Sequence, residues 1–401
     1  MKREAVHIYE DGHASGDTEL WKRVSLLNVV EIVSGQVDPK QSPYNEMILV
    51  APDHIEPCTG RIISKETART QSAISGKYYA KKGCVLYSKI RPYLCKAAIA
   101  DEDVLCSADM YPIHCKDEIL PQYLLYILLS KHFTDFTASM SGRTGIPKIN
   151  REELAEYHFD LPTIENQLKI SKILNTWDTA ITQTERLIAA KQKLKKGLMQ
   201  QLLTGKRRLE SFKCDWKIRK LSEVAIITMG SSPPSAAYND MQEGLPLIQG
   251  NADIVNRVSA PRLWTSTITK TCNINDILVS VRAPVGEVFI SHHHACIGRG
   301  MCAIKSKKGT SLPYLFQSLL CMESQWIKLS QGSTFTAINS NDLKDLKIQM
   351  PDDYAEQEKI ADILSAMDGE LSLLKRVILK IKEQKRGLMQ KLLTGQVRVK
   401  I

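Results

Sequence analysis

The chain has 401 residues, a formal net charge of +10 at pH 7 and a pI of about 9.0. It is long enough for two hydrophobic cores, and no apolar run approaches the roughly 18 residues that span a bilayer. The 10 cysteines include no Cys-x-x-Cys pair, and no signal peptide is evident, so we expect free thiols and a cytoplasmic location. The positive charge is compatible with a polyanionic partner, but many basic proteins bind nothing acidic.

Short strands and helices alternate along the chain from Trp21 onwards. The pattern predicts strands such as 84–90, then a helix at 120–127 and a Gly/Ser/Thr loop at 141–145. The second half repeats this order, starting at Trp216, which predicts an α+β fold for each globular region. The predicted regions are an N-terminal segment at 1–20, a first globular domain at 21–160, a first long helix with its connector at 161–210, a second globular domain at 211–349 and a second long helix at 350–401.

One segment of the chain occurs twice, at a constant offset in the numbering (387 − 197 = 368 − 178 = 190). The matched positions include Gln167 and Gln357, Asp178 and Asp368, Gly197 and Gly387, and Gly205 and Gly395. Two copies of so long a segment indicate a duplicated unit rather than a solenoid, which needs several short repeats.

Each copy carries apolar residues every 3.5 positions over four heptads, which predicts a helix of roughly 50 Å with a seam against another helix. In the second copy only Lys385 interrupts the seam. The sustained period favours two helices that pack on each other, antiparallel, over two unrelated core helices. Gly205 and Gly395 stand where left-handed caps would end the helices. Gly197 and Gly387 should each cost about 1 kcal/mol relative to alanine, which predicts close packing there by the partner helix or by another protein.

Motifs for catalysis are missing from the sequence. It contains no P-loop, no Asn-Pro-Pro-Tyr/Phe stretch and no Gly-x-Ser-x-Gly elbow. A nuclease-like combination of 351–352 with 383–385 is set aside, because 383–385 falls on the heptad helix and is expected to be a solvated face. His292, His294 and Cys296 would share one face of a strand, but no second ligand cluster at zinc-site spacing accompanies them. We therefore predict no catalytic residue and no metal site.

The repeated ending Gly-Leu-Met-Gln-x-Leu-Leu-Thr-Gly (197–205 and 387–395) resembles the conserved helical regions of type I restriction–modification specificity subunits. Other segments resemble the target recognition domains of that family: 276–286 and 296–300 for the core, 230–234 and 249–251 for the early part, and 86–94 for a variant core in the first half. The first domain departs from the pattern around Gly35, where the Pro-Pro of the second domain is absent.

The resemblance implies a DNA-reading subunit without its own active site. It implies two similar target recognition domains, separated by two long helices in an antiparallel coiled coil with pseudo-two-fold symmetry. Each domain would read one half of a split, asymmetric double-stranded DNA target, while the helices set the spacing and bind two methyltransferase subunits. Restriction and translocase subunits would join them. S-adenosylmethionine, ATP and Mg would belong to those partners, so we expect no cofactor on this chain and no membrane partner.

The duplication narrows the candidate contacts. Residues common to both globular regions, such as Arg91 and Arg282, favour a role in the shared fold or on the DNA backbone, because two identical readers would impose a symmetric target. Discrimination is expected from cationic and polar side chains where the halves differ. The candidate DNA contacts are Lys81, Lys82, Arg143, Thr144, Lys148, Ser231, Ser232, Asn251, Arg257, Arg299, Ser333 and Thr334. The candidate partner contacts on the helices are Gln167, Asp178, Gly197, Gln357, Asp368 and Gly387.

Three alternatives stay open at the level of the sequence. A metal-dependent nuclease that uses the region of His292 would cleave DNA without partners. A specificity subunit of a fused nuclease–methyltransferase system would differ in its neighbouring genes. A coiled-coil scaffold unrelated to DNA would bind no duplex, even at low salt.

Overall fold

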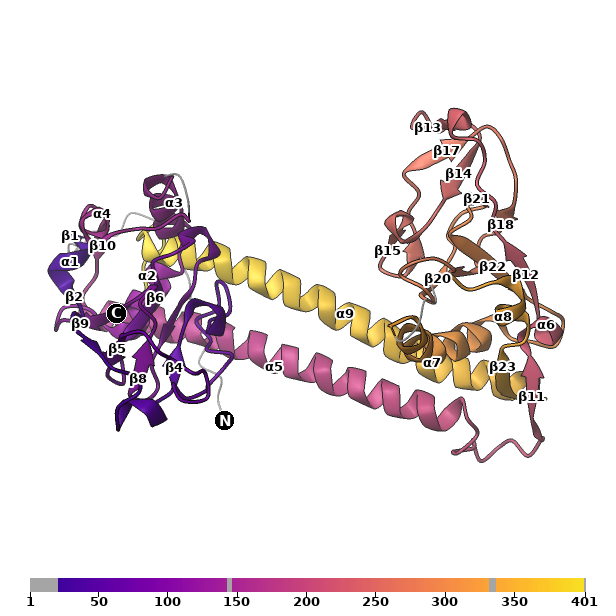
Figure 1. Ribbon diagram of the computed structural model, residues 1–401, viewed down its shortest axis with the longest axis horizontal. Helices are drawn as coiled ribbons and strands as arrows, with labels where there is room; N and C mark the ends of the chain where they lie inside the picture. The colour runs from indigo at the N-terminus through magenta and orange to yellow at the C-terminus, as the bar shows by residue number, and fades with distance from the viewer. Residues whose placement is uncertain (1–20, 143–145, 332–336, 400–401) are drawn as a thin grey trace. The chain divides into compact units, whose positions relative to one another are not determined.

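The computed structural model describes residues 21–142, 146–331 and 337–399 (Figure 1). The chain divides into two compact units, a first unit of Met1–Glu185 with Arg376–Ile401 and a second unit of Arg186–Lys375. Two long helices, α5 (Ile164–Leu202) and α9 (Tyr354–Leu393), are divided between the units. The first part of α5 and the last part of α9 belong to the first unit, and the remaining parts belong to the second. Over the described ranges, no helix has both the length and the apolar character needed to cross a membrane.

Two four-stranded sheets form the centre of the first unit. One is antiparallel and contains, in spatial order, β2 (Val30–Ile32), β9 (Met110–Cys115), β6 (Val85–Ser88) and β7 (Ala97–Ile99). The other contains β3 (Gln36–Val37), β5 (Lys77–Ala80), β8 (Val104–Cys106) and β4 (Leu49–Val50), with β8 and β4 parallel. A separate antiparallel pair joins β1 (Lys22–Ser25) to β10 (His158–Leu161), the strand that leads into α5.

Helices of the first unit pack on these sheets. They are α1 (Leu26–Val29), α2 (Pro121–Leu128), α3 (Lys131–Met140) and α4 (Arg151–Ala155), with 3-10 turns η1 (Tyr44–Glu46), η2 (Pro52–His54) and η3 (Pro92–Leu94). Proline at the first position of α2 suits a helix start, and the side chains of α2 from Tyr123 onwards are buried. The predicted helix at 120–127 is thus confirmed within one residue at either end.

The second unit repeats this plan with larger sheets. Its six-stranded sheet contains, in order, β12 (Ala225–Met229), β22 (Met301–Ser306), β19 (Ile277–Ser280), β20 (Val288–Ile290), β16 (Val258–Ser259) and β15 (Ile254–Val255). Its five-stranded sheet contains β13 (Tyr238–Asn239), β17 (Leu263–Thr265), β14 (Leu245–Ile248), β21 (Ala295–Ile297) and β18 (Thr271–Cys272). The pair β11 (Trp216–Lys220) and β23 (Lys347–Pro351) precedes α9 as β1 and β10 precede α5. The remaining elements are α6 (Leu221–Val224), α7 (Leu312–Gln331), α8 (Ser340–Lys344), η4 (Ser235–Ala237) and η5 (Asn251–Asp253).

The strands β6 and β19 occupy equivalent places in the two units. Each lies between two antiparallel neighbours and ends at a buried serine. Ser88 Oγ donates to the Ile90 carbonyl at 2.9 Å, and Ser280 Oγ donates to the Pro284 carbonyl at 2.7 Å. The predicted α+β fold is therefore confirmed, and Ser88 and Ser280 occupy matching places, although their hydroxyls bond carbonyls at different positions in the loops that follow.

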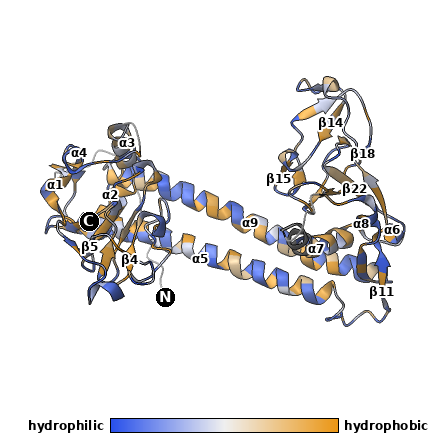
Figure 2. Ribbon diagram, viewed as in Figure 1, coloured by the Kyte–Doolittle hydropathy of each residue, from blue (hydrophilic) through white to orange (hydrophobic). Residues whose placement is uncertain are grey.

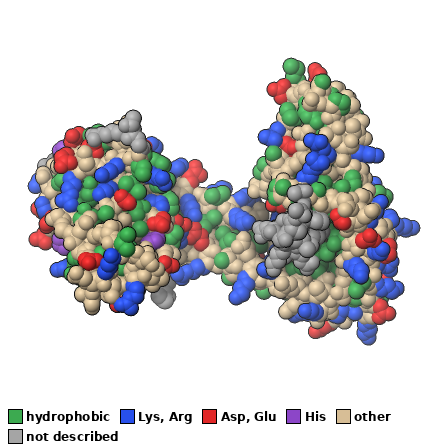
Figure 3. Space-filling model, in the orientation of Figure 1, with side chains coloured by type: hydrophobic (Ala, Val, Ile, Leu, Met, Phe, Trp, Pro, Cys, Tyr) green, Lys and Arg blue, Asp and Glu red, His purple; other side chains and the backbone are tan. Residues whose placement is uncertain are grey.

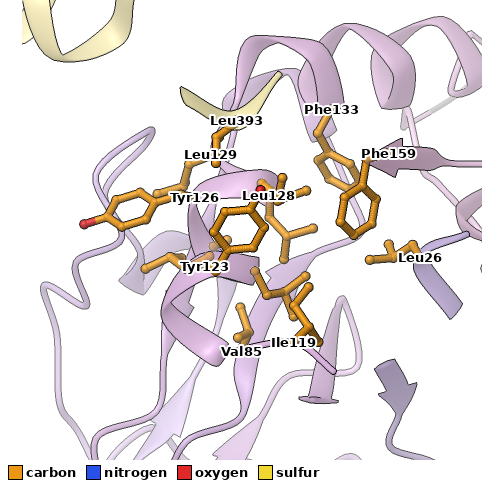
Figure 4. Close-up of a cluster of buried hydrophobic side chains, with 14 of the residues drawn as sticks. Leu26, Val85, Ile119, Tyr123, Tyr126, Leu128, Leu129, Phe133, Phe159 and Leu393 are labelled. Carbon is orange, nitrogen blue, oxygen red and sulfur yellow. The ribbon is translucent and has the colours of Figure 1, made fainter. Parts of the chain in front are cut away.

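The apolar residues of the repeated segment join the cores of both units. Met389, Leu392 and Leu393 of α9 pack into the first core, where Figure 4 shows Leu393 beside the side chains of α2. Their copies in α5, earlier in the chain by the same offset (389 − 199), pack into the second core. Figure 2 shows hydrophobic and hydrophilic residues alternating along both helices, as expected for helices with one buried face.

Within each unit the segments of α5 and α9 run antiparallel. In the first unit Asp178 pairs with Lys385 at 2.5 Å and Glu185 pairs with Lys382 at 2.7 Å, so the order of partners reverses. In the second unit Lys191 pairs with Glu370 and Lys195 with Asp368, in the same reversed sense. The predicted antiparallel packing is confirmed.

One expectation about the helices was wrong, and a second was wrong for one of its two alternatives, close packing of the mid-helix glycines by the partner helix, while packing there by another protein stays a prediction. The trio 383–385 is not a wholly solvated face, because Lys385 is only 8% exposed and its ammonium pairs with Asp178. Gly197 and Gly387 have no close neighbour in the described part of the chain, since a Cβ built on either would meet no atom within 4 Å.

Both helix ends have the predicted left-handed glycine. Gly205 has φ +67° and Gly395 has φ +70°. A Cβ on Gly205 would lie 3.1 Å from the Trp216 ring, and one on Gly395 would lie 3.5 Å from the Trp21 ring. In each unit, the glycine that ends a long helix therefore packs against a tryptophan, Trp216 for Gly205 and Trp21 for Gly395.

Candidate nucleic-acid interface

A polar cleft of about 540 Å³ opens on the second unit. Four segments distant in sequence form its walls: the loop before η4, the turn after β14, the loop after β19 and the turn before β22. Its lining residues are Ser232, Pro233, Ser235, Tyr238, Gln249, Gly250, Asn251, Arg282, Ala283, Arg299 and Gly300. Three predicted DNA contacts, Ser232, Asn251 and Arg299, are thus brought together.

Glycines allow the walls of this cleft to approach. A Cβ on Gly300 would clash with the Gln249 carbonyl oxygen, and one on Gly230 would clash with the Gly298 carbonyl oxygen. Both contacts are with backbone, which cannot rotate away, so only glycine fits. The Gly-Arg-Gly stretch therefore presents Arg299 at the rim on a fixed backbone.

The polar side chains of the cleft divide into bound and available groups. Ser232 Oγ accepts from the Arg299 backbone N–H at 3.1 Å, and Asn251 Nδ2 donates to the Glu287 carboxylate. In contrast, Arg282 and Arg299 are exposed, and neither guanidinium has a hydrogen-bond or ion-pair partner among the described residues. Two unpaired guanidiniums at a concave polar surface suit guanine edges or phosphates.

The sequence analysis did not nominate Gln249 or Tyr238 as a DNA contact, although segment 249–251 carried part of the family resemblance. Gln249 Nε2 donates to Tyr238 Oη at 2.8 Å, and that hydroxyl donates to the Pro233 carbonyl at 2.9 Å. This chain of hydrogen bonds orients the Gln249 amide in the wall of the cleft. The sequence feature that could have identified Gln249 is its place directly before the Gly250-Asn251 turn.

Arg257 and Ser231 lie outside this cleft. Both terminal nitrogens of Arg257 donate to the Glu323 carboxylate, at 2.5 and 2.9 Å, and these hydrogen bonds raise the pKa of Arg257. Arg257 also donates to the Val288 carbonyl, and it lines a separate cleft of about 490 Å³ together with Lys195 and Asp368. Its donors are engaged within the unit, so we remove Arg257 from the candidate DNA contacts. Ser231 is exposed, and its backbone pairs with Ile297.

Cations gather around Tyr111 on the first unit. Lys89 Nζ lies 5.2 Å from the centre of the Tyr111 ring, and the Arg151 guanidinium lies 5.7 Å from it. Burial, together with the positive charges of Lys148 and Arg151, lowers the pKa of Lys89. Of this group the sequence analysis nominated only Lys148 as a DNA contact; the shared residues of the motif that contains Lys89 were assigned to the common fold or to the DNA backbone.

The loops after β6 and β19 each present an exposed arginine, but the bridges match Arg282 with Ile90, so Arg91 lies one residue further along its loop. Ile90 forms an isolated bridge with Lys148, and Arg282 forms one with Ala337. Arg91 and Arg282 are both exposed, and Arg91 N–H donates to the Pro147 carbonyl at 2.7 Å. The predicted contacts Arg143, Thr144, Ser333 and Thr334 lie outside the described residues, in the segments that lead into these bridges.

Lys81 and Lys82 lie in the turn after β5 and are exposed. The Lys82 backbone N–H donates to Asp103 Oδ1 at 2.9 Å, which fixes the turn and leaves the side chain pointing to solvent. Figure 3 shows Lys and Arg interspersed with Asp and Glu on the visible face of each unit. Charge alone therefore does not separate these lysines from ordinary surface residues.

The glutamines nominated as partner contacts are structural. Gln167 is buried, accepts from Leu120 N–H at 2.8 Å and donates to the Glu118 and Pro162 carbonyls. Gln357 is also buried and makes the matching bonds to Ser311, Gly309 and Pro351. Each amide joins the start of a long helix to the start of α2 or α7. We therefore remove both from the candidate partner contacts.

The nominated aspartates are structural as well. Asp178 accepts from Lys385 and from Tyr126 Oη at 2.9 Å, and Asp368 accepts from Lys195 and from Gln317 Nε2 at 2.9 Å. Each aspartate therefore ties a long helix both to its antiparallel partner and to a helix of the globular part. Sequence reasoning noticed the repeated aspartates but missed the lysines, which repeat at the same offset (385 − 195).

His292, His294 and Cys296 do not converge. Cys296 is buried against Thr269 Oγ1, while His294 Nδ1 contacts Asn273 Oδ1 at 3.1 Å. Over the described ranges, no group of three or more His, Cys, Asp or Glu side chains could hold a metal.

Comparison with known proteins identifies the family of this chain. The family model for the type I restriction modification DNA specificity domain matches twice, at residues 18–192 and 213–383. The chain belongs to this specificity family. The two matches cover most of the chain, and each begins three residues before a tryptophan, Trp21 or Trp216 (21 − 18 = 216 − 213 = 3).

Individual relatives of this specificity chain agree with that assignment. The provisionally named type I restriction enzyme MjaX specificity subunit of Methanocaldococcus jannaschii is 36% identical over 300 residues, which cover 71% of this chain and 70% of the relative. A solved structure from work on complex assembly and conformational transition of the type I R-M system is 27% identical with a TM-score of 0.67, and the match covers 96% of this chain and 100% of that one. The HsdS subunit of Thermoanaerobacter tengcongensis is also 27% identical, with a TM-score of 0.52 and coverage of 94% and 97%.

Proposed function

We propose that this chain is the DNA sequence-specificity subunit of a type I restriction–modification complex. The observation that carries the proposal is the double match to the specificity-domain family, one match for each globular region. Each unit would read one half of a split, asymmetric duplex target. The reading domains would correspond to the predicted 21–160 and 211–349.

The second unit supplies the better-defined reading surface. Arg282 and Arg299 line a concave wall, where their guanidiniums have no partner among the described residues, and the Gln249 amide is oriented by Tyr238. Arginine pairs in bidentate fashion with guanine, and glutamine does so with adenine. Arg91 and Arg282 are the exposed arginines of the two corresponding loops, so we assign both to the DNA backbone, and we assign discrimination to Arg299, Gln249 and their neighbours.

The first unit would contact DNA through Lys89, Lys148 and Arg151 around Tyr111, together with Arg91. These cationic side chains would neutralise DNA phosphates and release the counterions condensed on the duplex. Binding by this surface should therefore weaken steeply as salt rises.

The long helices would set the distance between the half-sites and bind two methyltransferase subunits. Leu187 and Val377 are matched positions of the repeat (377 − 187 = 190), and they are 44% and 38% exposed. Exposed apolar residues and, ten residues further along each helix (197 − 187 = 387 − 377), glycines with free space around them suit a docking helix. Restriction subunits would then join. S-adenosylmethionine, ATP and Mg would reside on those partners in the cytoplasm, and this chain would be non-catalytic.

The test begins with the target. A methylome of a host with the gene, compared with its deletion, identifies the methylated sequence. Purified chain with its methyltransferase is then titrated by fluorescence anisotropy against duplexes in which neither, one or both half-sites are scrambled. We expect each scrambled half to weaken binding independently. Absence of duplex binding at low salt with the methyltransferase present would favour the scaffold alternative, and metal-dependent cleavage by the chain alone would favour the nuclease.

A further inference from the structure

A short hairpin in the first unit carries an exposed cysteine at its apex. Ile55 and Ile62 form an antiparallel bridge, and Glu56 N–H donates to the Arg61 carbonyl at 3.0 Å. Inside this turn Thr59 Oγ1 accepts from Arg61 N–H at 3.2 Å. The backbone around Cys58 is therefore held in one conformation, although the Cys58 side chain is exposed.

The apex lies against a second, buried cysteine. Cys58 N–H donates to the Cys95 carbonyl at 2.8 Å, so the two residues are joined directly through their backbones. Two residues joined by a backbone hydrogen bond lie near the Cα separation of roughly 4.4–6.8 Å that a disulfide spans. Cys95 follows η3, and its Sγ contacts the Leu129 carbonyl at 3.4 Å. The backbone contact therefore places the two cysteines as neighbours in space.

The two thiols differ in reactivity. The hydrogen bond from Cys95 stabilises the thiolate of Cys58 and lowers the pKa of Cys58 to about 7, against the opposing effect of burial. The same interaction and burial raise the pKa of Cys95. An exposed thiolate beside a protected thiol is the arrangement of an attacking and a resolving cysteine.

We propose that Cys58 and Cys95 form a redox-sensitive pair that closes a disulfide when a hydroperoxide oxidises Cys58. The Cys58 thiolate attacks the peroxide, whose O–O bond breaks, and this yields a sulfenic acid and releases an alcohol or water. The Cys95 sulfur then attacks the Cys58 sulfur, the S–O bond breaks, and water leaves with the Cys95 proton. The peroxide is reduced by two electrons, and the two thiols are oxidised by two. A thiol reductant reverses the change.

The disulfide would join the hairpin around Cys58, which contacts the long helices, to the loop that runs from Arg91 to Cys95. The hairpin holds α5 through Arg61, which donates to Glu185 at 2.6 Å, and Glu185 also pairs with Lys382 of α9. Cys95 closes the loop that begins at Arg91. Oxidation would thus fix the junction with the long helices relative to the exposed arginine, an effect that goes beyond the proposed DNA-reading function.

The test uses the full chain and requires no DNA. Reduced protein is treated with hydrogen peroxide at pH 7.5, alkylated and analysed by peptide mass spectrometry. We expect a linked pair of peptides that contain Cys58 and Cys95, lacking two hydrogens and restored by dithiothreitol. In Cys95→Ser, Cys58 should accumulate as a sulfenic acid that dimedone traps. In Cys58→Ser, Cys95 should stay unmodified.

The exposed Cys214 is the matched control. Alkylation of Cys58 should rise with pH to half its maximum near pH 7, and at that pH it should be about tenfold faster than alkylation of Cys214. Equal rates at Cys58 and Cys214, or oxidation of Cys58 without linkage to Cys95, would overturn the proposal. Neither result would bear on DNA binding, so the two proposals fail separately.

Discussion

The junctions in the two units and the candidate DNA surfaces of the two units behave differently. At the junctions, Asp178 with Lys385 and Asp368 with Lys195 are copies of one arrangement, and Gln167 and Gln357 make matching hydrogen bonds. At the surfaces, the first unit has cations around a tyrosine, whereas the second has a cleft built on glycines.

The difference indicates which contacts the duplication retains. A junction must hold the same helices in the same register, so the same residues serve in both units. A surface that reads half of an asymmetric target must differ from its copy. The four predictions that follow test this separation, beginning with the largest effect.

Glu356 is the clearest departure within the junctions, because the matched position in the first unit is Asn166 (356 − 190). Glu356 is fully buried and accepts from Arg208 at 3.0 and 3.1 Å and from Trp216 Nε1 at 3.3 Å. Glu356→Ala leaves a half-buried arginine without its carboxylate and should lower the stability of the second unit by about 3 kcal/mol. Asn166→Ala should cost the first unit about 1 kcal/mol. Hydrogen exchange resolved by peptide measures each unit; equal losses would contradict the comparison.

The two lysine–aspartate pairs should contribute unequally to the free energy of unfolding. Asp178 is less exposed than Asp368, 29% against 43% for the side chains, so Lys385→Met should cost about 2 kcal/mol and Lys195→Met about 1 kcal/mol. Urea unfolding of both variants gives the two values. A double-mutant cycle with Asp178→Asn checks the pair, because a coupling energy near zero would show that Lys385 acts elsewhere.

Arg282→Ala should weaken binding to the cognate duplex about tenfold and reduce the salt dependence by about one counterion. The unfolding midpoint should not change, because the guanidinium is exposed. Lys308→Ala, at the far end of β22 from the cleft, is the matched control and should bind normally. Arg299→Ala should instead lower the preference for the second half-site. If Arg299→Ala weakens all duplexes equally, then Arg299 contacts only the backbone.

The smallest effect concerns the open glycines. Gly197→Ala or Gly387→Ala should stabilise the isolated chain by about 1 kcal/mol, because the new methyl group meets no atom within 4 Å. If a methyltransferase helix packs there, the same change should weaken the complex, measured by calorimetric titration of the methyltransferase into each variant. Unchanged affinity would place the docking surface elsewhere on the helices.

The sequence by itself determined the duplicated α+β plan, the antiparallel helices and the glycine caps. It could do so because periodicity and capping are local properties, and because the constant offset between the two copies compares the chain with itself. The same comparison identified Gln167 and Asp178 as important positions. It could not say whether their side chains faced a partner or the interior.

Only the tertiary structure decided those directions. Lys385 interrupts the apolar seam and was expected to be solvated. Its ammonium is nevertheless buried, because it pairs with Asp178, 207 residues away in the sequence. Arg257 looked free until Glu323, from a distant helix, engaged both of its terminal nitrogens. Likewise, the cleft around Arg282 and Arg299 unites four segments whose approach depends on backbone contacts at Gly230 and Gly300. Burial and partnership of a charge depend on residues far along the chain, and a local pattern contains no information about them.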